Sequence, residues 1–353
     1  MATRSTIYAV ARRSGVSTAT VSRVMSDGTG FSTETRDRVL AAATDLGWVP
    51  SNSARGLATQ RSGIVGLLFP DLGHSGEAEK ESPLYVDEVI RGAERAATAA
   101  GDAVLIAATH SSSGRDLAFS IASKVDGLVV LARSLSAADL SSISRSIPIV
   151  VLANASARRG FDFVGADSRG GARAVTAHLI AEHGYRDLAF MSGPARSPDS
   201  IERFAGFCEA LAAADLPVPD APDADGSFTE AGGERAMRAL LALRHRPPRA
   251  VVVGNDEMTL GALATLRAAR MRVPADVALT GFDDIAAARH VRPALTTVRQ
   301  PMRELGERSV ETLLQRIREP RTPRRSLLLE TDVVIRRSCG CRRRPAHADR
   351  GAA

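Results

Sequence analysis

Hydroxyl side chains and one arginine recur between residues 17 and 23, at fixed distances from a small residue and a glycine. Ala11 is the small residue, Gly15 follows four positions later, and Val21 six positions after that. A small residue at a helix contact, a turn glycine and a buried aliphatic residue in this order are typical of a helix-turn-helix. Short hydrogen-bonding side chains on the outer face of the second helix suit the phosphates and base edges of a DNA duplex.

Three helices are expected to position this pattern. They cover residues 7–14, residues 18–25 and a stretch that begins after Ser32. Thr6, Ser17 and Ser32 precede them, and the oxygen of such a side chain can accept a hydrogen bond from the first turn of a helix. The polar residues 51–60 that follow predict a linker or a marginal helix.

The pattern changes after Ser62, where short β-branched runs alternate with alanine-rich amphipathic segments. The predicted strands lie at residues 64–69, 104–108, 128–131, 149–152, 188–191, 251–253 and 277–279. The predicted helices lie at residues 85–100, 115–123, 171–183, 200–214, 230–243 and 258–269. This alternation indicates parallel sheets with helices on both faces, and the number of units suits two sheets. A cleft between two such sheets can close around a small molecule.

Charge is distributed unevenly along the 353 residues, whose net charge is +6. Residues 1–61 hold eight arginines and four acidic residues, whereas the segment between residues 61 and 336 is mildly acidic. A basic head on an acidic body indicates that one end of the chain binds nucleic acid. The sequence contains neither a membrane-spanning apolar run nor a signal-peptide pattern, so we expect a cytoplasmic protein without a membrane partner.

The three cysteines, Cys208, Cys339 and Cys341, are too few for a disulfide framework. Cys339 and Cys341 stand beside a basic end that is expected to be disordered, where they would be incidental thiols; metal or redox use is the alternative. His178 and His183 lie five positions apart on one predicted helix, a poor ligand spacing, and are interpreted as ordinary helix residues. We therefore predict no metal, no cofactor and no catalytic residue.

Several independent motifs, in the same order, resemble those of the lactose/galactose-repressor (LacI/GalR) family of transcriptional regulators over residues 5–338. In the head they are Ala11-x3-Gly15-Val16-Ser17-x2-Thr20-Val21-Ser22-Arg23-Val24, Ser32-x2-Thr35-Arg36-x2-Val39-x6-Leu46-Gly47-Trp48-x-Pro50 and Ala54-Arg55-Gly56-Leu57. In the body they are Arg203-x2-Gly206-Phe207-x2-Ala210-Leu211, Val252-Val253-Gly254-Asn255-Asp256-Glu257-Met258, Gly281-Phe282-Asp283-Asp284 and Leu295-Thr296-Thr297-Val298-Arg299-Gln300-Pro301.

The resemblance implies a small all-α helix-turn-helix head and a two-lobed α/β body like periplasmic binding proteins, with parallel sheets. The head would take residues 1–49, a hinge residues 50–61, the body residues 62–339 and a disordered basic tail residues 340–353. One lobe would take about 62–164 and 294–325, and the other about 165–293 and 326–339. The resemblance also implies a homodimer on a near-palindromic double-stranded operator, controlled by a small effector, most simply a sugar, with a purine-like ligand as the alternative.

The family's DNA contacts can be carried over to the head. The base-reading positions fall on Thr18, Ala19 and Arg23, with Ser22 nearby; the alternative for Arg23 is a phosphate contact. Residues expected on the phosphate side are Tyr8, Ser17, Thr20, Ser26, Ser32 and Thr35. In the hinge, Ala54 and Leu57 match residues of the family's hinge motif. Leu57 would insert into the minor groove of the operator; the alternative is a linker leucine that packs on the body.

The family's effector contacts fall on Arg203, Asn255 and Asp283, whose guanidinium, amide and carboxylate could together hold vicinal hydroxyls. Tyr85 and Phe228 match aromatic wall positions, and Asp71 is a further candidate. For three of these residues a purely structural role is the alternative to effector binding: a helix cap for Asp283, core packing for Phe228 and a surface ion pair for Arg203.

Two other classes of protein share parts of this pattern. A solute-binding protein for transport would have the same two-lobed body but would need export and no DNA-binding head. An enzyme would need a phosphate loop, a nucleophile elbow or a metal-spaced set of histidines, none of which the sequence contains. The family's tetramers use a leucine-heptad tail, and residues 340–353 contain no leucine, so we predict a dimer.

Overall fold

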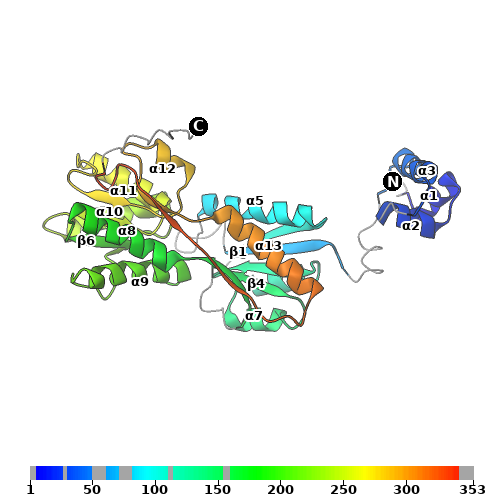
Figure 1. The fold of residues 1–353 in the computed structure, drawn as a ribbon, viewed down its shortest axis with the longest axis horizontal. Helices are drawn as coiled ribbons and strands as arrows, with labels where there is room; N and C mark the ends of the chain where they lie inside the picture. The colour runs from blue at the N-terminus through cyan, green and yellow to red at the C-terminus, as the bar shows by residue number, and fades with distance from the viewer. Residues whose placement is uncertain are drawn as a thin grey trace, which may run out of the picture. The chain divides into compact units, whose positions relative to one another are not determined.

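The computed structural model describes residues 5–26, 30–49, 61–70, 82–109, 114–153 and 160–341. The chain divides into two compact units, residues 1–63 and 64–353. The first is a small helical unit, here called the head, and the second is an α/β unit, here called the body (Figure 1).

In the head, α1 (Ile7–Ser14), α2 (Thr18–Ser26) and α3 (Thr33–Asp45) enclose a core of small and β-branched side chains. Gly15 ends α1 with a φ of 69°, a left-handed conformation that costs glycine little, and so allows the tight turn into α2. The buried core residues are Val10, Ala11, Val21, Val24, Val39, Ala42 and Ala43. The predicted helix-turn-helix is therefore confirmed.

Two of the three predicted helix caps form in the head. The backbone N–H of Thr20 donates to Ser17 Oγ at 3.1 Å, and that of Thr35 donates to Ser32 Oγ at 3.3 Å. Thr6 occupies the N-cap position of α1, but its side chain makes no capping hydrogen bond. Side-chain capping by Thr6 was thus wrongly predicted.

The first lobe of the body is built on a parallel sheet in the order β11-β5-β4-β3-β1-β2. Its strands are β1 (Ile64–Pro70), β2 (Ala103–Thr109), β3 (Gly127–Leu131), β4 (Ile149–Leu152), β5 (Asp162–Ala166) and β11 (Ser326–Leu329). Its helices are α5 (Pro83–Ala99), α6 (Gly114–Ala122), α7 (Ala137–Ile143) and α13 (Met302–Arg318). Apolar residues of α5 and α13 cover one face of the sheet, and those of α6 and α7 cover the other.

The second lobe repeats this three-layer arrangement around a parallel sheet in the order β7-β6-β8-β9. Its strands are β6 (Leu188–Ser192), β7 (Ala224–Asp225), β8 (Ala250–Val253) and β9 (Ala278–Thr280). Its helices are α8 (Ser168–His183), α9 (Pro198–Ala213), α10 (Glu230–Leu243), α11 (Asp256–Ala268) and α12 (Ala286–His290). One face packs against α8 and α9 and the other against α10 and α11.

An antiparallel pair, β10 (Thr297–Arg299) and β12 (Asp332–Val334), lies where the chain passes between the lobes. The prediction gave residues 326–339 to the second lobe, but β11 pairs in parallel with β5, with Ser326 opposite Phe163. Residues 326–329 therefore belong to the first lobe, because they complete the edge of its sheet. The last passage between the lobes comes after Leu329.

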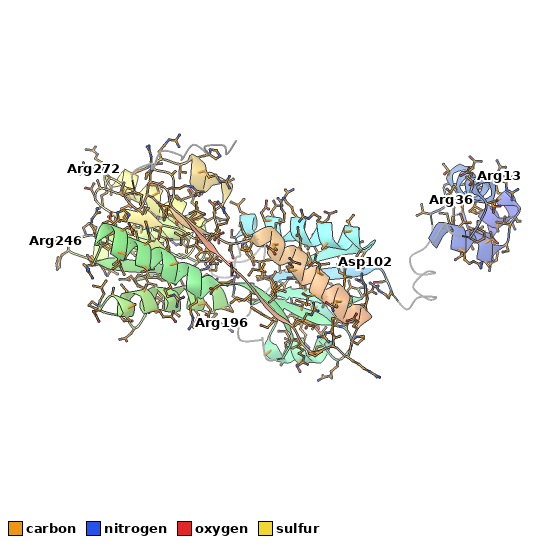
Figure 2. The ribbon with its side chains drawn as sticks, viewed as in Figure 1. Arg13, Arg36, Asp102, Arg196, Arg246 and Arg272 are labelled. Carbon is orange, nitrogen blue, oxygen red and sulfur yellow. The ribbon has the colours of Figure 1, made fainter. Side chains whose placement is uncertain are left out.

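The end of the described chain also differs from the prediction, which placed residues 340–353 in a disordered tail. Gly340 and Cys341 are described, and Cys339 before them is fully buried. Residues 342–353 lie outside the described residues. The five arginines labelled in Figure 2 are all exposed: Arg13, Arg36, Arg196, Arg246 and Arg272. Among the described helices, none is long and apolar enough to cross a membrane.

Candidate DNA-binding face and interlobe cavity

The outer face of α2 carries the predicted base-reading residues. Ala19, Ser22 and Arg23 are exposed and Thr18 is half-buried, whereas Val21 and Val24 point into the core. The Arg23 guanidinium lies over the ring of Phe31, 5.4 Å from its centroid. Because the apolar side of the helix is buried in the head, its polar side is left free to meet a partner.

Hydroxyl groups surround the N-termini of α2 and α3. The hydroxyls of Ser17 and Thr20 lie 2.9 Å apart, and those of Ser32 and Thr35 lie 3.0 Å apart. A helix N-terminus with free N–H groups and hydroxyls is a ready site for a phosphate. Tyr8 on α1 is 66% exposed. Ser26 is the last residue of α2.

Three predicted positions cannot be placed. Ala54 and Leu57 of the hinge, and Asp71 of the effector site, lie outside the described residues.

The other five predicted effector residues line one cavity between the lobes. They are Tyr85 from the first lobe and Arg203, Phe228, Asn255 and Asp283 from the second. Ser82, Asp199 and Gln300 complete the lining. Ser82 Oγ also donates to Glu257 Oε1 at 2.5 Å, a hydrogen bond that joins the two lobes at the rim of the cavity.

Arg203 is held rigidly within this cavity. Its guanidinium lies over the ring of Phe282, 3.8 Å from the centroid, and 5.7 Å from the centroid of Phe228. One terminal nitrogen donates to the carbonyl of Gly254 at 2.6 Å and lies 3.9 Å from Asp283 Oδ1. The side chain is 4% exposed, so the surface ion pair left open for Arg203 is wrong; the pair is buried.

Asp283 and Asn255 complete a polar group on the wall of the second lobe. Asp283 Oδ1 accepts from Gln300 Nε2 at 2.5 Å, and burial raises the pKa of this carboxyl well above its usual value, although Arg203 opposes the shift. Asn255 caps α11 by accepting from the N–H of Met258 at 3.0 Å, while its amide donates to the carbonyl of Phe228. The helix cap in this cavity is thus Asn255 and not Asp283.

Three residues that line this cavity, Ser82, Asp199 and Gln300, were not predicted from the sequence. Gln300 lies within the motif of residues 295–301, but nothing in the sequence indicated that its amide would contact the Asp283 carboxylate. Asp199 lies one turn before Arg203 on α9, and burial raises its pKa, opposed by Arg203 and by a hydrogen bond from Ser168. It also lines a larger cavity of about 360 Å³ between the lobes, with Phe163 and Leu328 from the first sheet.

A second group of polar side chains forms where none was expected. His178 and His183, predicted to be ordinary helix residues, lie with Cys339 and Cys341 so that their four potential ligand atoms are all within 4.8 Å of one another. Spacing along the helix missed this cluster because the two cysteines arrive from a segment more than 150 residues later.

Comparison with known proteins places both units in one family. Residues 6–51 match the model of bacterial regulatory proteins of the lacI family, and residues 176–339 match that of the periplasmic binding protein-like domain. The HTH-type transcriptional repressor PurR of Klebsiella pneumoniae (strain 342) is 32% identical over 338 residues, which are 94% of this chain and 96% of the relative.

Solved structures agree in fold over nearly the whole chain. A complex of the transcriptional regulator CelR with cellobiose is 33% identical, covers 95% of this chain and 100% of that chain, and has a TM-score of 0.70. The lac repressor dimer bound to operator and the anti-inducer ONPF is 26% identical, covers 96% and 99%, and has a TM-score of 0.82. The related proteins are regulators, and the transport and enzyme alternatives are therefore dropped. With its helix-turn-helix head and two-lobed body, this chain belongs to the LacI/GalR family and is a DNA-binding transcriptional repressor, not an enzyme.

Proposed function

We propose that this repressor binds a near-palindromic operator as a homodimer and that a polyhydroxylated effector of the sugar class, held in the interlobe cavity, sets its affinity for DNA. The observation that carries the proposal is the buried group of Arg203, Asp283 and Asn255, set between aromatic side chains and lined by residues of both lobes.

The chemistry of this group suits hydroxyl groups. The guanidinium of Arg203 only donates hydrogen bonds, the carboxylate of Asp283 only accepts them, and the amide of Asn255 does both. A sugar hydroxyl is both donor and acceptor, so neighbouring hydroxyls can satisfy all three. The rings of Phe228 and Tyr85 provide apolar surface for the faces of a sugar ring, and both are buried.

Effector binding on this scheme is coupled to opening and closing of the lobes. The space left among the described residues of the cavity is about 10 Å³, whereas a site for a small molecule needs roughly 300 Å³ or more. The lobes must therefore separate to admit a ligand. The hydrogen bond from Ser82 to Glu257 crosses the rim and would break on opening.

A purine-like effector is the second candidate. The repressor PurR relatives favour it, at 32% identity over 94% of the chain, while the CelR–cellobiose complex, at 33% identity over 95%, favours a sugar. The two candidates differ in chemistry, since a purine offers donors and acceptors in the plane of a flat ring, around its edges, and a sugar offers hydroxyls on several sides of a puckered ring.

Calorimetry on the full-length protein with a panel of mono- and disaccharides, including cellobiose, and of purine bases tests the proposal. We expect one sugar to bind and to change operator affinity, and Asn255→Ala to abolish both effects. If a purine binds and no sugar does, the effector is a purine and the sugar proposal is wrong. Binding of a sugar that Asn255→Ala leaves unchanged would show that the assigned cavity is wrong.

The DNA side of the proposal has its own test. Selection from random duplex DNA with the full-length protein should enrich a palindrome, and binding should weaken steeply with salt, because phosphate contacts release counterions. Sedimentation should give a dimer. Enrichment of unrelated sequences without symmetry would contradict the proposed operator, and a tetramer that persists on dilution would contradict the proposed assembly.

A further inference from the structure

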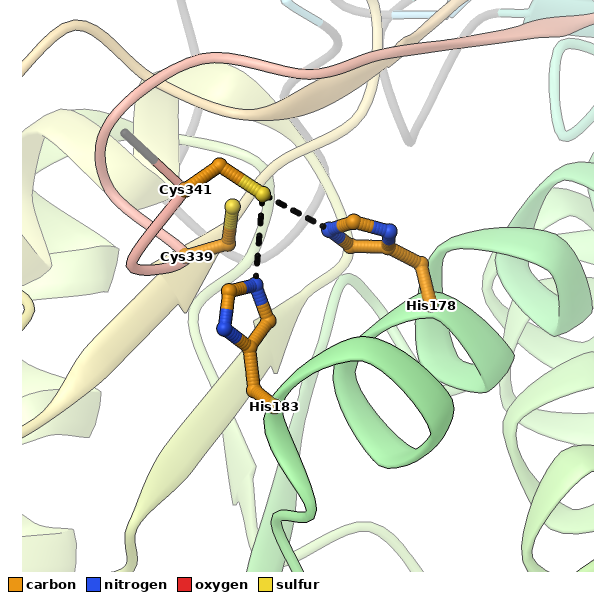
Figure 3. A group of neighbouring side chains, drawn as sticks. All are labelled: His178, His183, Cys339 and Cys341. Carbon is orange, nitrogen blue, oxygen red and sulfur yellow. Dashed lines mark hydrogen bonds between the residues drawn. The ribbon is translucent and has the colours of Figure 1, made fainter. Parts of the chain in front are cut away.

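The four-residue cluster in the second lobe lies apart from the head and the interlobe cavity. His178 and His183 come from the last turns of α8, and Cys339 and Cys341 come from the turn that follows β12 (Figure 3). The two imidazole rings and the two thiols point toward one another, and the four nearest nitrogen and sulfur atoms lie within 4.8 Å. The cluster contains two nitrogen and two sulfur donors.

The distances match those around a tetrahedral metal ion. Cys341 Sγ lies 3.5 Å from His178 Nε2 and 3.4 Å from His183 Nε2. With zinc–sulfur bonds of about 2.3 Å and zinc–nitrogen bonds of about 2.0–2.1 Å, the edge between a sulfur and a nitrogen of a tetrahedron is about 3.5 Å. Two edges of the coordination tetrahedron are therefore already present, and both run from the Cys341 sulfur to the Nε2 nitrogen of a histidine.

Surrounding residues fix the orientation of the donors. The ring of Tyr185 stacks on that of His183, with centroids 5.2 Å apart, and its hydroxyl donates to the carbonyl of Cys339 at 3.0 Å. Thr296 Oγ1 donates to Cys339 Sγ at 3.0 Å. Such outer contacts orient ligands in known metal sites and favour a thiolate.

Gly340 allows the turn that brings the second thiol to the histidines. Its φ is 110°, and a Cβ at this position would lie 2.9 Å from the hydroxyl of Tyr185 and 3.3 Å from the ring of His183. Only glycine fits this conformation and this approach. Ser338 anchors the turn from the other side, because its hydroxyl donates to the carbonyl of Leu279 at 2.6 Å and accepts from the N–H of Thr296 at 2.8 Å.

We propose that His178, His183, Cys339 and Cys341 bind one Zn²⁺ ion in a closed, tetrahedral site. Mixed imidazole and thiolate donors in a tetrahedron select zinc over the hard cations Mg²⁺ and Ca²⁺, which prefer oxygen. Four protein ligands leave no open position, so the site is structural and not catalytic. Zinc takes up two thiolates and two neutral imidazoles, and the thiol protons are released to solvent on binding.

The position of the site gives it a role in the body. Cys339 and Cys341 lie at the end of the last passage between the lobes, which begins after β11 of the first sheet. The helix α8 begins directly after the first passage, which leaves β5. The ion would therefore link the segment after β12, which ends the last connection between the lobes, to α8, which follows the first connection. Because zinc would bind the folded second lobe and not the unfolded chain, it would stabilise the fold, by an amount that rises with the logarithm of the free zinc concentration above the Kd.

Metal analysis of the full-length protein, purified under reducing conditions, tests the proposal first. We expect one zinc ion per chain, and Co²⁺ in its place should give the visible bands of a tetrahedral ion together with sulfur-to-cobalt charge transfer. The variant Cys341→Ser, at a half-buried position, should weaken metal binding by more than the 10–100-fold that loss of an outer contact typically costs. It should also lower the charge-transfer intensity by about half, since one of two thiolates is lost.

The third cysteine provides the matched control. Cys208 lies on α9, outside the cluster, so Cys208→Ser should keep the zinc content, the cobalt spectrum and the gain in melting temperature on zinc addition. Circular dichroism of Cys341→Ser without metal checks that the variant folds. Absence of zinc and cobalt binding, a Cys339–Cys341 disulfide in the reduced preparation, or an unchanged cobalt spectrum in Cys341→Ser would each overturn the site.

Discussion

The outer face of α2 and the interlobe cavity use similar residue types in opposite physical settings. Arg23 on α2 is exposed and its guanidinium lies over the ring of Phe31, whereas Arg203 is 4% exposed and is held by an aromatic ring, a carbonyl and a carboxylate. An exposed arginine contributes little to the folded protein and is available to a large charged partner. A buried one must be satisfied within the protein, so ligand binding and folding share the same contacts.

The largest effect is expected from Arg203→Ala. Removing the guanidinium leaves the buried carboxylate of Asp283 without its positive partner, and breaking such a pair costs about 3–5 kcal/mol. We expect the free energy of unfolding to fall by this amount in urea titration and effector binding to be lost, while the variant still binds operator at temperatures where it is folded.

The exposed Arg246 gives the control for this change. It lies on the surface of the second lobe (Figure 2), and Arg246→Ala should alter stability by no more than about 0.5 kcal/mol. If both variants unfolded alike, the buried pair would have no special role in stability.

The next effect concerns pH and the carboxylate of Asp256, next to the cavity. Burial raises its pKa to about 7, against the hydrogen bonds from Thr297 and Ile285. A raised pKa means that the folded state holds the proton more tightly. This contribution to stability is therefore present below about pH 4 and is lost as the pH rises to about 7, by up to about 1.4 kcal/mol per pH unit.

Asp256→Asn tests this dependence, because an amide cannot ionise and can keep both hydrogen bonds if the Thr297 hydroxyl reverses its role. Urea midpoints at about pH 5 and about pH 7 should differ less in the variant than in the parent protein. Asp276 is the matched control, since a hydrogen bond from Arg272 lowers its pKa and it is ionised throughout. Equal pH slopes in the parent protein and Asp256→Asn would contradict the raised pKa.

Arg23→Ala is expected to change DNA binding and not stability. Specific binding should weaken by about 1–3 kcal/mol, with relaxed preference at one base position of each half-site. Arg13→Ala removes the same charge from α1, where Arg13 pairs with Asp45 at 3.4 Å, and should leave the base preference intact. A uniform loss for all sequences in Arg23→Ala would make Arg23 a phosphate contact.

The smallest effect is expected from Ser17→Ala at the start of α2. The hydroxyl accepts from the N–H of Thr20, and loss of such a cap costs about 1 kcal/mol. Operator affinity, measured by fluorescence anisotropy, should fall for specific and unrelated duplexes alike, because the cap positions the helix without reading bases. Loss confined to the specific duplex would instead indicate that Ser17 contacts a base.

Elements with a clear apolar period could be predicted from the sequence, although not all of them were. The strand at residues 149–152 is an uninterrupted β-branched and aliphatic run, and its predicted bounds are those of β4. By contrast, α13 was not predicted although it has such a period: Leu305, Val310 and Leu313 are buried at helical spacing between many arginines and glutamates, so the signal was present and was overlooked. β11 was missed because its burial comes from an edge pairing with a strand about 160 residues earlier.

The sequence by itself determined the helix-turn-helix, its two serine caps, the α/β layering of the body and the family, because these follow from local spacing, helix capping and hydrophobic periodicity. Tertiary structure alone decided several of the contacts that the polar residues make. It placed Gln300 against Asp283, buried Arg203 between Phe282 and Phe228, and brought Cys341 to His178 and His183. The physical reason is that such contacts join segments distant in the chain, and their distances are fixed by how the two sheets and their connecting passages pack.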